Sequence, residues 1–219
     1  MLQFSSVPDY SESDLHRWVA GDYDLLGRSG ISSFIREILR EKAATRLEGR
    51  RKRKQPGDRR FFGEAYVARR IPHQEGWYGS FKWLTSPACL SETGRVGRFA
   101  GAYGVALKHH FGNHLSGLRE RARLLSDSHG VKPMPPDLWL ISGGKHRFIE
   151  AKLRGDNVRE SQLAGLAVIA VSLCAAVPMS VEVVRAFSEC EPRRPAKEES
   201  ENRRMLDSFK EFCRVLHRA

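Results

Sequence analysis

The chain has 219 residues, of which 41% are hydrophobic, and this is enough for one sizeable core with extensions. No run approaches the roughly 18 consecutive apolar residues of a membrane span, and the N-terminus lacks the basic start and apolar run of a signal peptide. The cysteines are widely spaced without a C-x-x-C pair, which argues against a zinc knuckle or a disulfide framework. We expect an intracellular protein, cytoplasmic if prokaryotic or phage-encoded and nuclear if eukaryotic.

Charge is the most informative bulk property. Lys and Arg total 37 against 26 Asp and Glu, which gives a net charge of +11 and a pI near 9.9. Such an excess attracts polyanions, because neutralising phosphates releases condensed counterions. Nucleic acid is therefore the expected partner, with solubility alone as the alternative explanation.

Residues 1–60 are predicted to form a helical, basic N-terminal extension. A helix is expected over about 31–47, because Ile31, Phe34, Ile35, Ile38 and Leu39 fall on one face. It runs into five consecutive basic residues: Arg50, Arg51, Lys52, Arg53 and Lys54. This run fits a phosphate-binding arm and a solvated linker about equally well, and a nuclear-import signal is a third reading.

A compact core is predicted over 61–188. It begins with a helix carrying Phe62 and Tyr66, and the aromatic stretch "GWYGSFKWLT" then predicts a strand. An insertion follows at about 87–131, in which glycines interrupt the chain before a polar helix over about 105–126. Arg95 and Arg98 of this insertion are expected either to touch phosphates or to face solvent.

The second half of the core is predicted as a hairpin, a helix and a strand. Residues 138–141 and 148–153 flank "SGGK", whose two glycines suit a hairpin turn. A helix is expected next, with Asn157 as its cap and Glu160 as the capping-box partner. A last strand starts after Pro178. This order predicts a mixed α/β domain around a small central sheet.

Residues 189–219 are predicted as a linker over 189–204 and a terminal amphipathic helix. The apolar face of this helix consists of Met205, Phe209, Phe212, Cys213 and Leu216. This face must be buried either on this core or on a second protein, so a homodimer or a protein partner is an open alternative.

The predicted hairpin carries the chemistry. Side chains alternate along a strand, so Glu150 and Lys152 point to one face, and the turn brings Asp137 near the level of Glu150. Two close carboxylates repel each other, and Mg²⁺ is commonly held by one or two carboxylates together with substrate phosphate oxygens. An adjacent ammonium can stabilise a developing phosphorane or orient the attacking water. This equipment suits phosphodiester hydrolysis.

"PD" at 136–137 and "EAK" at 150–152 resemble the signature of the PD-(D/E)xK nuclease superfamily. The stretch "PDLWL…FIEAKLRGDNVRESQLAGLAVI" is most similar to the VRR-NUC branch. The resemblance covers roughly residues 61–187 and implies a restriction-endonuclease-like core, a small mixed sheet flanked by helices, with helical extensions at both ends.

The resemblance also implies roles for individual residues. Asp137 and Glu150 would be metal ligands, Lys152 the catalytic lysine, and the carbonyl of Ala151 a further ligand. Gln162 matches a glutamine that supports the site in this branch. Glu64 matches an acidic residue on the first helix that adds a metal ligand. For Gln162 and Glu64 the alternative is a helix-surface position.

The predicted function is therefore a Mg²⁺- or Mn²⁺-dependent nuclease, acting on DNA rather than RNA. The basic run 50–54, with Arg95 and Arg98, would hold phosphates without reading sequence. The alternatives are a non-catalytic nucleic-acid-binding protein and a subunit that docks onto a repair, phage or defence complex through its terminal helix.

Overall fold

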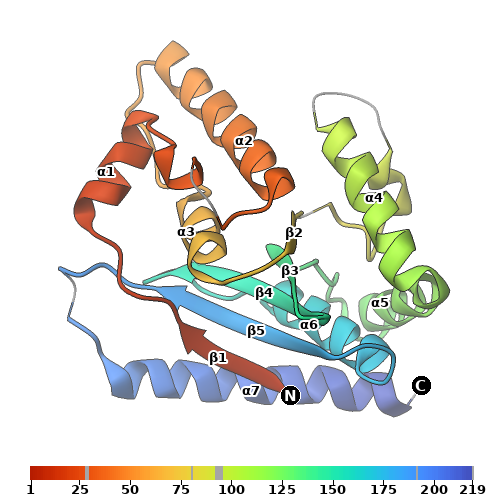
Figure 1. The fold of residues 1–219 in the computed structure, drawn as a ribbon. Coiled ribbons are helices and arrows are strands. Elements are labelled where there is room, and N and C mark those ends of the chain that lie inside the picture. The colour runs from red at the N-terminus through yellow and green to blue at the C-terminus, as the bar shows by residue number, and fades with distance from the viewer. Residues whose placement is uncertain (28–29, 80, 92–95, 191, 219) are drawn as a thin grey trace.

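A five-stranded mixed sheet forms the centre of the chain in this computed structural model, which describes residues 1–27, 30–79, 81–91, 96–190 and 192–218 (Figure 1). The strands are β1 (Leu2–Ser6), β2 (Glu75–Tyr78), β3 (Leu138–Ser142), β4 (Lys145–Leu153) and β5 (Met179–Ala186). Their order in the sheet is β1-β5-β4-β3-β2. β1 and β4 each pair in parallel with β5, whereas β2, β3 and β4 form an antiparallel meander. The predicted mixed α/β class is confirmed.

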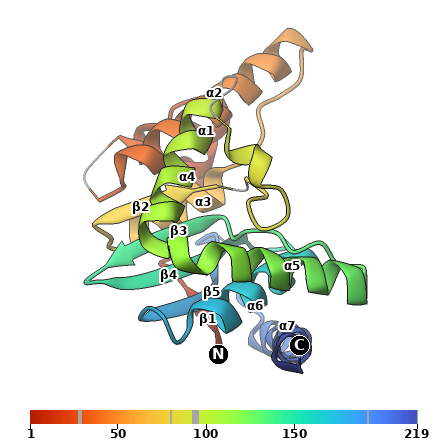
Figure 2. The ribbon, with the colours of Figure 1, turned by 90° about the vertical axis from the view of Figure 1, so that its right-hand side faces the viewer.

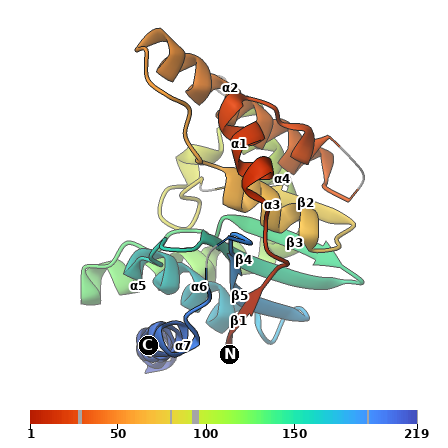
Figure 3. The same ribbon diagram turned by 90° about the vertical axis from the view of Figure 1, so that its left-hand side faces the viewer.

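Helices cover both faces of the sheet. They are α1 (Glu12–Ala20), α2 (Ser33–Lys52), α3 (Phe62–Arg70), α4 (Gly97–Phe111), α5 (Leu115–His129), α6 (Glu160–Leu173) and α7 (Pro195–Arg218). Figures 2 and 3 show α1, α2 and α3 on one side of the sheet and α6 and α7 on the other. None of these described helices is long and apolar enough to cross a membrane.

The predicted hairpin is confirmed as β3 and β4. Gly143 and Gly144 form its turn at φ values of 56° and 75°, the left-handed region that a two-residue hairpin turn needs. The register pairs Leu138 with Ile149, which fixes the level at which the neighbouring Asp137 approaches β4.

Residues 1–60, predicted as an extension, contribute both to the sheet and to the core. β1 was not predicted; it pairs in parallel with β5 along the edge of the sheet. α2 begins at the N-cap Ser32, whose hydroxyl accepts a hydrogen bond from the N–H of Ile35. Ile35 and Ile38 are fully buried as predicted. The helix continues beyond residue 47, so the basic run begins within α2.

The prediction of one polar helix over 105–126 was wrong. Two helices, α4 and α5, are separated by a short turn at Gly112–His114, and α4 begins inside the glycine-rich stretch. The physical reason is an apolar series at four-residue spacing, Phe99, Tyr103, Leu107 and Phe111, which is buried and outweighs the low helix propensity of glycine. Phe111 and Tyr103 contact Trp139 of β3 with ring centroids 5.1 and 6.0 Å apart.

The predicted linker over 189–204 was also wrong in its second half. α7 starts at Pro195, a residue favoured in the first helical turn, and pairs such as Lys197 with Glu201 support its exposed side. Phe209, Phe212 and Leu216 are buried, and α7 packs against α6 and α5. The apolar face of the terminal helix is therefore covered by this chain's own core.

Candidate active site

Asp137 lies immediately before β3, beside β4. Its Oδ2 accepts a hydrogen bond of 3.1 Å from the backbone N–H of Ala151. Its own carbonyl accepts one of 3.2 Å from the N–H of Gly79, which ties the start of β3 to the end of β2. The carboxylate is thereby held between the strands, at the level that the hairpin register predicts.

Glu150 and Lys152 lie on the same face of β4, as the alternation predicts. Lys152 Nζ is 2.6 Å from Glu150 Oε1. The Glu150 side chain is fully buried, whereas 12% of the Lys152 side chain is exposed, at the wall of a cleft. Asp137, Glu150 and Lys152 therefore converge on one end of the hairpin.

The amide of Gln162 links Glu150 to the start of α6. Its Nε2 donates to Glu150 Oε1, and its Oε1 accepts a 2.9 Å hydrogen bond from the N–H of Arg159. The predicted cap, Asn157 with Glu160, is wrong, because α6 begins at Glu160 with Arg159 as its N-cap. Gln162 fills the capping-box position and fixes the helix start against Glu150.

Glu64 of α3 approaches the same group from above the sheet. It lines the cleft together with Asp137 and Lys152. Burial, and then repulsion by the Asp137 carboxylate, raise the pKa of Glu64 to about 8. Glu64 is half-buried at the cleft wall, so its carboxyl is less hydrated than one on an open helix surface.

The site concentrates more negative charge than its single lysine balances. Burial, and then repulsion by Asp137, hold the pKa of Glu150 well above its usual value despite the attraction of Lys152. Burial alone would lower the pKa of Lys152, but the carboxylates of Glu150 and Asp137 outweigh it and raise that pKa. Lys152 is consequently an ammonium at neutral pH, while the carboxyl groups favour either protons or a cation.

The residues fit a divalent cation. Glu150 Oε2 is buried and has no hydrogen-bond partner among the described residues, so it is an unsatisfied acceptor, although Glu150 itself does not line the cleft. Within the described ranges, no three His, Cys, Asp or Glu side chains are grouped so as to hold a metal by themselves. The expected set without Glu64 differs from such a group, because it combines two carboxylates with the backbone carbonyl of Ala151, and Mg²⁺ completes its octahedron with water. Among the described residues, the expected addition of Glu64 is not seen as a grouping of three carboxylates.

A cleft of about 660 Å³ opens at this group. The residues that line it are Arg59, Arg60, Phe61, Gly63, Glu64, Asp137, Ala151, Lys152, Leu153, Gly155, Asp156, Asn157, Arg159 and Gln162. Arg59 Nη2 pairs with Asp156 Oδ1 at 2.9 Å across its rim. Glu64, Asp137, Ala151, Lys152 and Gln162, all predicted from the sequence, share this cleft.

Phe61 lines the cleft and Lys42 contacts its ring, and neither residue was predicted from the sequence. Phe61 has φ +66°, which is unusual for a bulky residue, and its ring is half-buried whereas the adjacent Phe62 is fully buried. Lys42 Nζ lies 5.9 Å from the Phe61 ring and 5.8 Å from the ring of Tyr78. The available signal was the doublet "FF" at 61–62, because helical spacing places only its second member in the core.

The predicted phosphate-binding residues do not line the cleft. Arg50 contacts Asp58 and the carbonyl of Pro56, Arg51 donates to the carbonyl of Ala20, and Lys52 pairs with Glu48. Arg53 and Lys54 are exposed, and Figure 1 shows the C-terminal end of α2 standing away from the sheet. Arg98 pairs with Glu41 at 3.0 Å and stacks on Phe99, and Arg95 lies outside the described residues.

Comparisons with models of protein families, with curated proteins and with solved structures found no significant match for this chain.

Proposed function

We propose that this chain is a metal-dependent nuclease of the PD-(D/E)xK type, most similar to the VRR-NUC branch, which hydrolyses phosphodiester bonds in DNA. One observation carries the proposal. Asp137 and Lys152 line one cleft, and Lys152 pairs with the fully buried Glu150, whose Oε2 has no hydrogen-bond partner among the described residues. Such an arrangement is costly in a purely structural role, because buried charges need partners.

Asp137, Glu150 and the Ala151 carbonyl would hold Mg²⁺ or Mn²⁺, with Glu64 as an additional ligand. When bound, the cation would polarise a phosphoryl oxygen and lower the pKa of a bound water. Burial, and then repulsion by Asp137, raise the pKa of Glu64 and Glu150, and a divalent cation would remove that repulsion, which supports this assignment.

Lys152 and Gln162 would act through charge and position. The Lys152 ammonium, held at Glu150, points its positive charge at the cleft, where it would stabilise the negative charge that develops on the scissile phosphate. Gln162 orients Glu150 from the start of α6, so it would be a positioning residue.

DNA is the proposed substrate. The net charge of +11 favours a polyanionic partner, and the family resemblance favours DNA over RNA.

The test is a cleavage assay on labelled single-stranded, duplex and branched DNA, with Mg²⁺, Mn²⁺ or EDTA. Wild type is expected to cut only with metal, and Asp137→Ala to lose at least about 100-fold in rate. The matched control is Asp127→Ala, which removes an exposed carboxylate paired with Arg123 and should keep full activity. Full activity in Asp137→Ala would disprove the proposal, and binding without cutting in every metal would favour a non-catalytic binding protein.

A further inference from the structure

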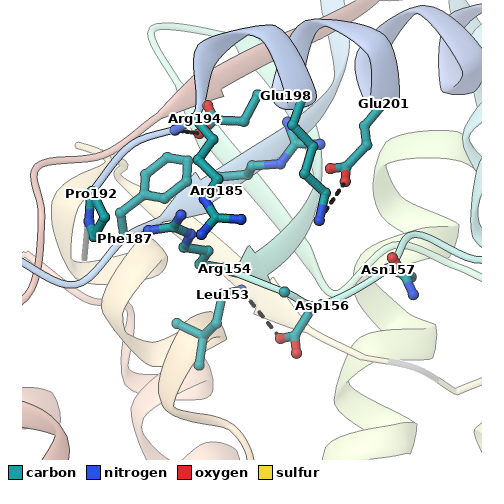
Figure 4. Close-up of a pocket in the computed structure, with 12 residues that line it drawn as sticks. Leu153, Arg154, Asp156, Asn157, Arg185, Phe187, Pro192, Arg194, Glu198 and Glu201 are labelled. Carbon is teal, nitrogen blue, oxygen red and sulfur yellow. Dashed lines mark hydrogen bonds and ion pairs between the residues drawn. The ribbon is translucent and has the colours of Figure 1, made fainter.

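A second cavity adjoins the candidate active site on the other side of the turn Leu153–Asp156. Its volume is about 430 Å³, and it lies between that turn, the end of β5 and the start of α7 (Figure 4). Leu153, Gly155, Asp156 and Asn157 line both this cavity and the cleft. The charged residues that line it are Arg154, Asp156, Arg185, Arg194, Lys197, Glu198 and Glu201. We call this cavity the basic pocket.

Arg185 lies on β5, next to the strand that carries Lys152. It pairs with Lys152 in the parallel β4–β5 register, so the two residues share a face on strands about 4.8 Å apart. Its half-buried guanidinium donates from Nη1 to Asn202 Oδ1 at 2.7 Å, which uses one of five N–H donors. Figure 4 shows Arg154, Arg185 and Arg194 gathered on one side of the pocket, near Phe187.

The acidic residues of the basic pocket have partners of their own. Asp156 pairs with Arg59 and accepts a hydrogen bond from the N–H of Leu153. Glu201 lies 3.9 Å from Lys197, and Glu198 accepts a hydrogen bond from the backbone N–H of Arg194. Glu201 and Glu198 also attract the Arg185 guanidinium electrostatically, although neither forms an ion pair with it among the interactions described. Guanidinium groups that converge in this way suit a shared phosphate, which they bind in a bidentate manner.

We propose that the basic pocket binds a backbone phosphate of the same nucleic-acid strand whose neighbouring phosphodiester enters the cleft. This inference rests on the proposed function, because the cleft supplies the second fixed point on the strand. The shared wall Leu153–Asp156 and the pairing of Lys152 with Arg185 place the two sites within a few nucleotides of each other. Phosphate contacts set the register of a strand without reading its bases, so the pocket would select which phosphodiester is presented.

The first test measures binding of a labelled DNA strand in EDTA over a range of salt, so that no turnover is needed. Arg185→Gln is expected to weaken binding roughly tenfold and to lower the slope of log K against log salt by about 0.7. Arg194→Gln should show the same effect in smaller measure. The control Arg123→Gln, an exposed arginine of α5 paired with Asp127, should bind within about twofold of wild type. Equal binding by wild type, Arg185→Gln and Arg194→Gln would disprove phosphate binding by the basic pocket.

The second test replaces one phosphate at a time by a neutral methylphosphonate. Wild type should lose affinity sharply at one position outside the cleft, and Arg185→Gln should be insensitive to neutralisation at that position. An identical profile in both proteins would overturn the pocket. A wild type that shows the expected profile but never cuts DNA would disprove the proposed nuclease and leave the pocket standing. Circular dichroism checks each fold, and the exposed Arg194→Gln keeps the test decisive if Arg185→Gln unfolds.

Discussion

Glu150 is the side chain around which the candidate site is built. Its Oε1 pairs with the Lys152 ammonium and accepts a hydrogen bond from Gln162. Its buried Oε2 has no hydrogen-bond partner among the residues described. A buried carboxylate oxygen without a donor costs about 1–3 kcal/mol or more. Burial, and then repulsion by Asp137, raise the pKa of Glu64, so the site's stability depends on protons or a cation.

Glu64→Gln should therefore separate stability from activity. The carboxyl keeps its proton to about pH 8 in the folded chain but loses it near 4.5 when unfolded, so folded protein binds more protons between these values. The free energy of unfolding of metal-free wild type should then fall as pH rises from about 4.5 to 8. Urea unfolding in EDTA should show a smaller fall for Glu64→Gln, together with lower nuclease activity. An equally steep fall in both proteins would contradict this assignment.

Substitutions of Phe61 test whether the surrounding fold imposes its left-handed backbone conformation. Its φ of +66° is imposed by anchored neighbours, because Trp18 Nε1 donates to the carbonyl of Arg60 and Asp58 pairs with Arg46. Phe61→Gly and Phe61→Ala both remove the ring, but only glycine accepts this conformation freely. We expect Phe61→Gly to be the more stable variant by roughly 0.5–1 kcal/mol in urea unfolding. A more stable Phe61→Ala would show that the residue relaxes out of this conformation.

Helices and strands that depend on local sequence patterns could be predicted from the sequence, whereas those that depend on tertiary contacts could not. The β3–β4 hairpin and the strand after Pro178 follow from turn residues and from runs of strand-forming residues. β1 could not be predicted in the same way, because "LQFSS" has no clear alternation and depends on the edge that β5 offers. Likewise, α4 depends on its burial against Trp139, which local glycine content conceals.

The hairpin turn gives a prediction at this scale. Gly144→Ala should lower the free energy of unfolding by about 1 kcal/mol, because φ of 75° is unfavourable for alanine. Gly112→Ala is the matched control, since Gly112 has helical φ and ψ of −47° and no neighbour within 4 Å of an added Cβ. The control should be neutral or more stable by up to about 1 kcal/mol. Thermal or urea unfolding measures both, and equal losses would contradict the turn assignment.

For the whole molecule, the candidate site joins three distant parts of the chain. Glu64 comes from α3, Asp137 and Lys152 from the hairpin, and Gln162 from α6. The spacing of Asp137 and Glu150 predicts their meeting, because a hairpin turn lies between them. For Glu64 and Gln162 the residues alone leave a surface position open, and the resemblance supplied their place in the site. Lys42 and the basic pocket depend on packing between elements, so no local pattern indicates them.

The most direct test of the central claim is the single-turnover rate of cleavage of one labelled DNA by wild type and Lys152→Gln, in Mg²⁺ and in EDTA. Lys152→Gln removes the ammonium but keeps an amide beside Glu150, and Lys210→Gln, at an exposed position of α7 that lines neither the cleft nor the basic pocket, is the control. We expect Mg²⁺-dependent cutting by wild type and the control, with a loss of at least about 100-fold in Lys152→Gln. Cutting at the wild-type rate by Lys152→Gln, or cutting that persists in EDTA, would contradict this expectation.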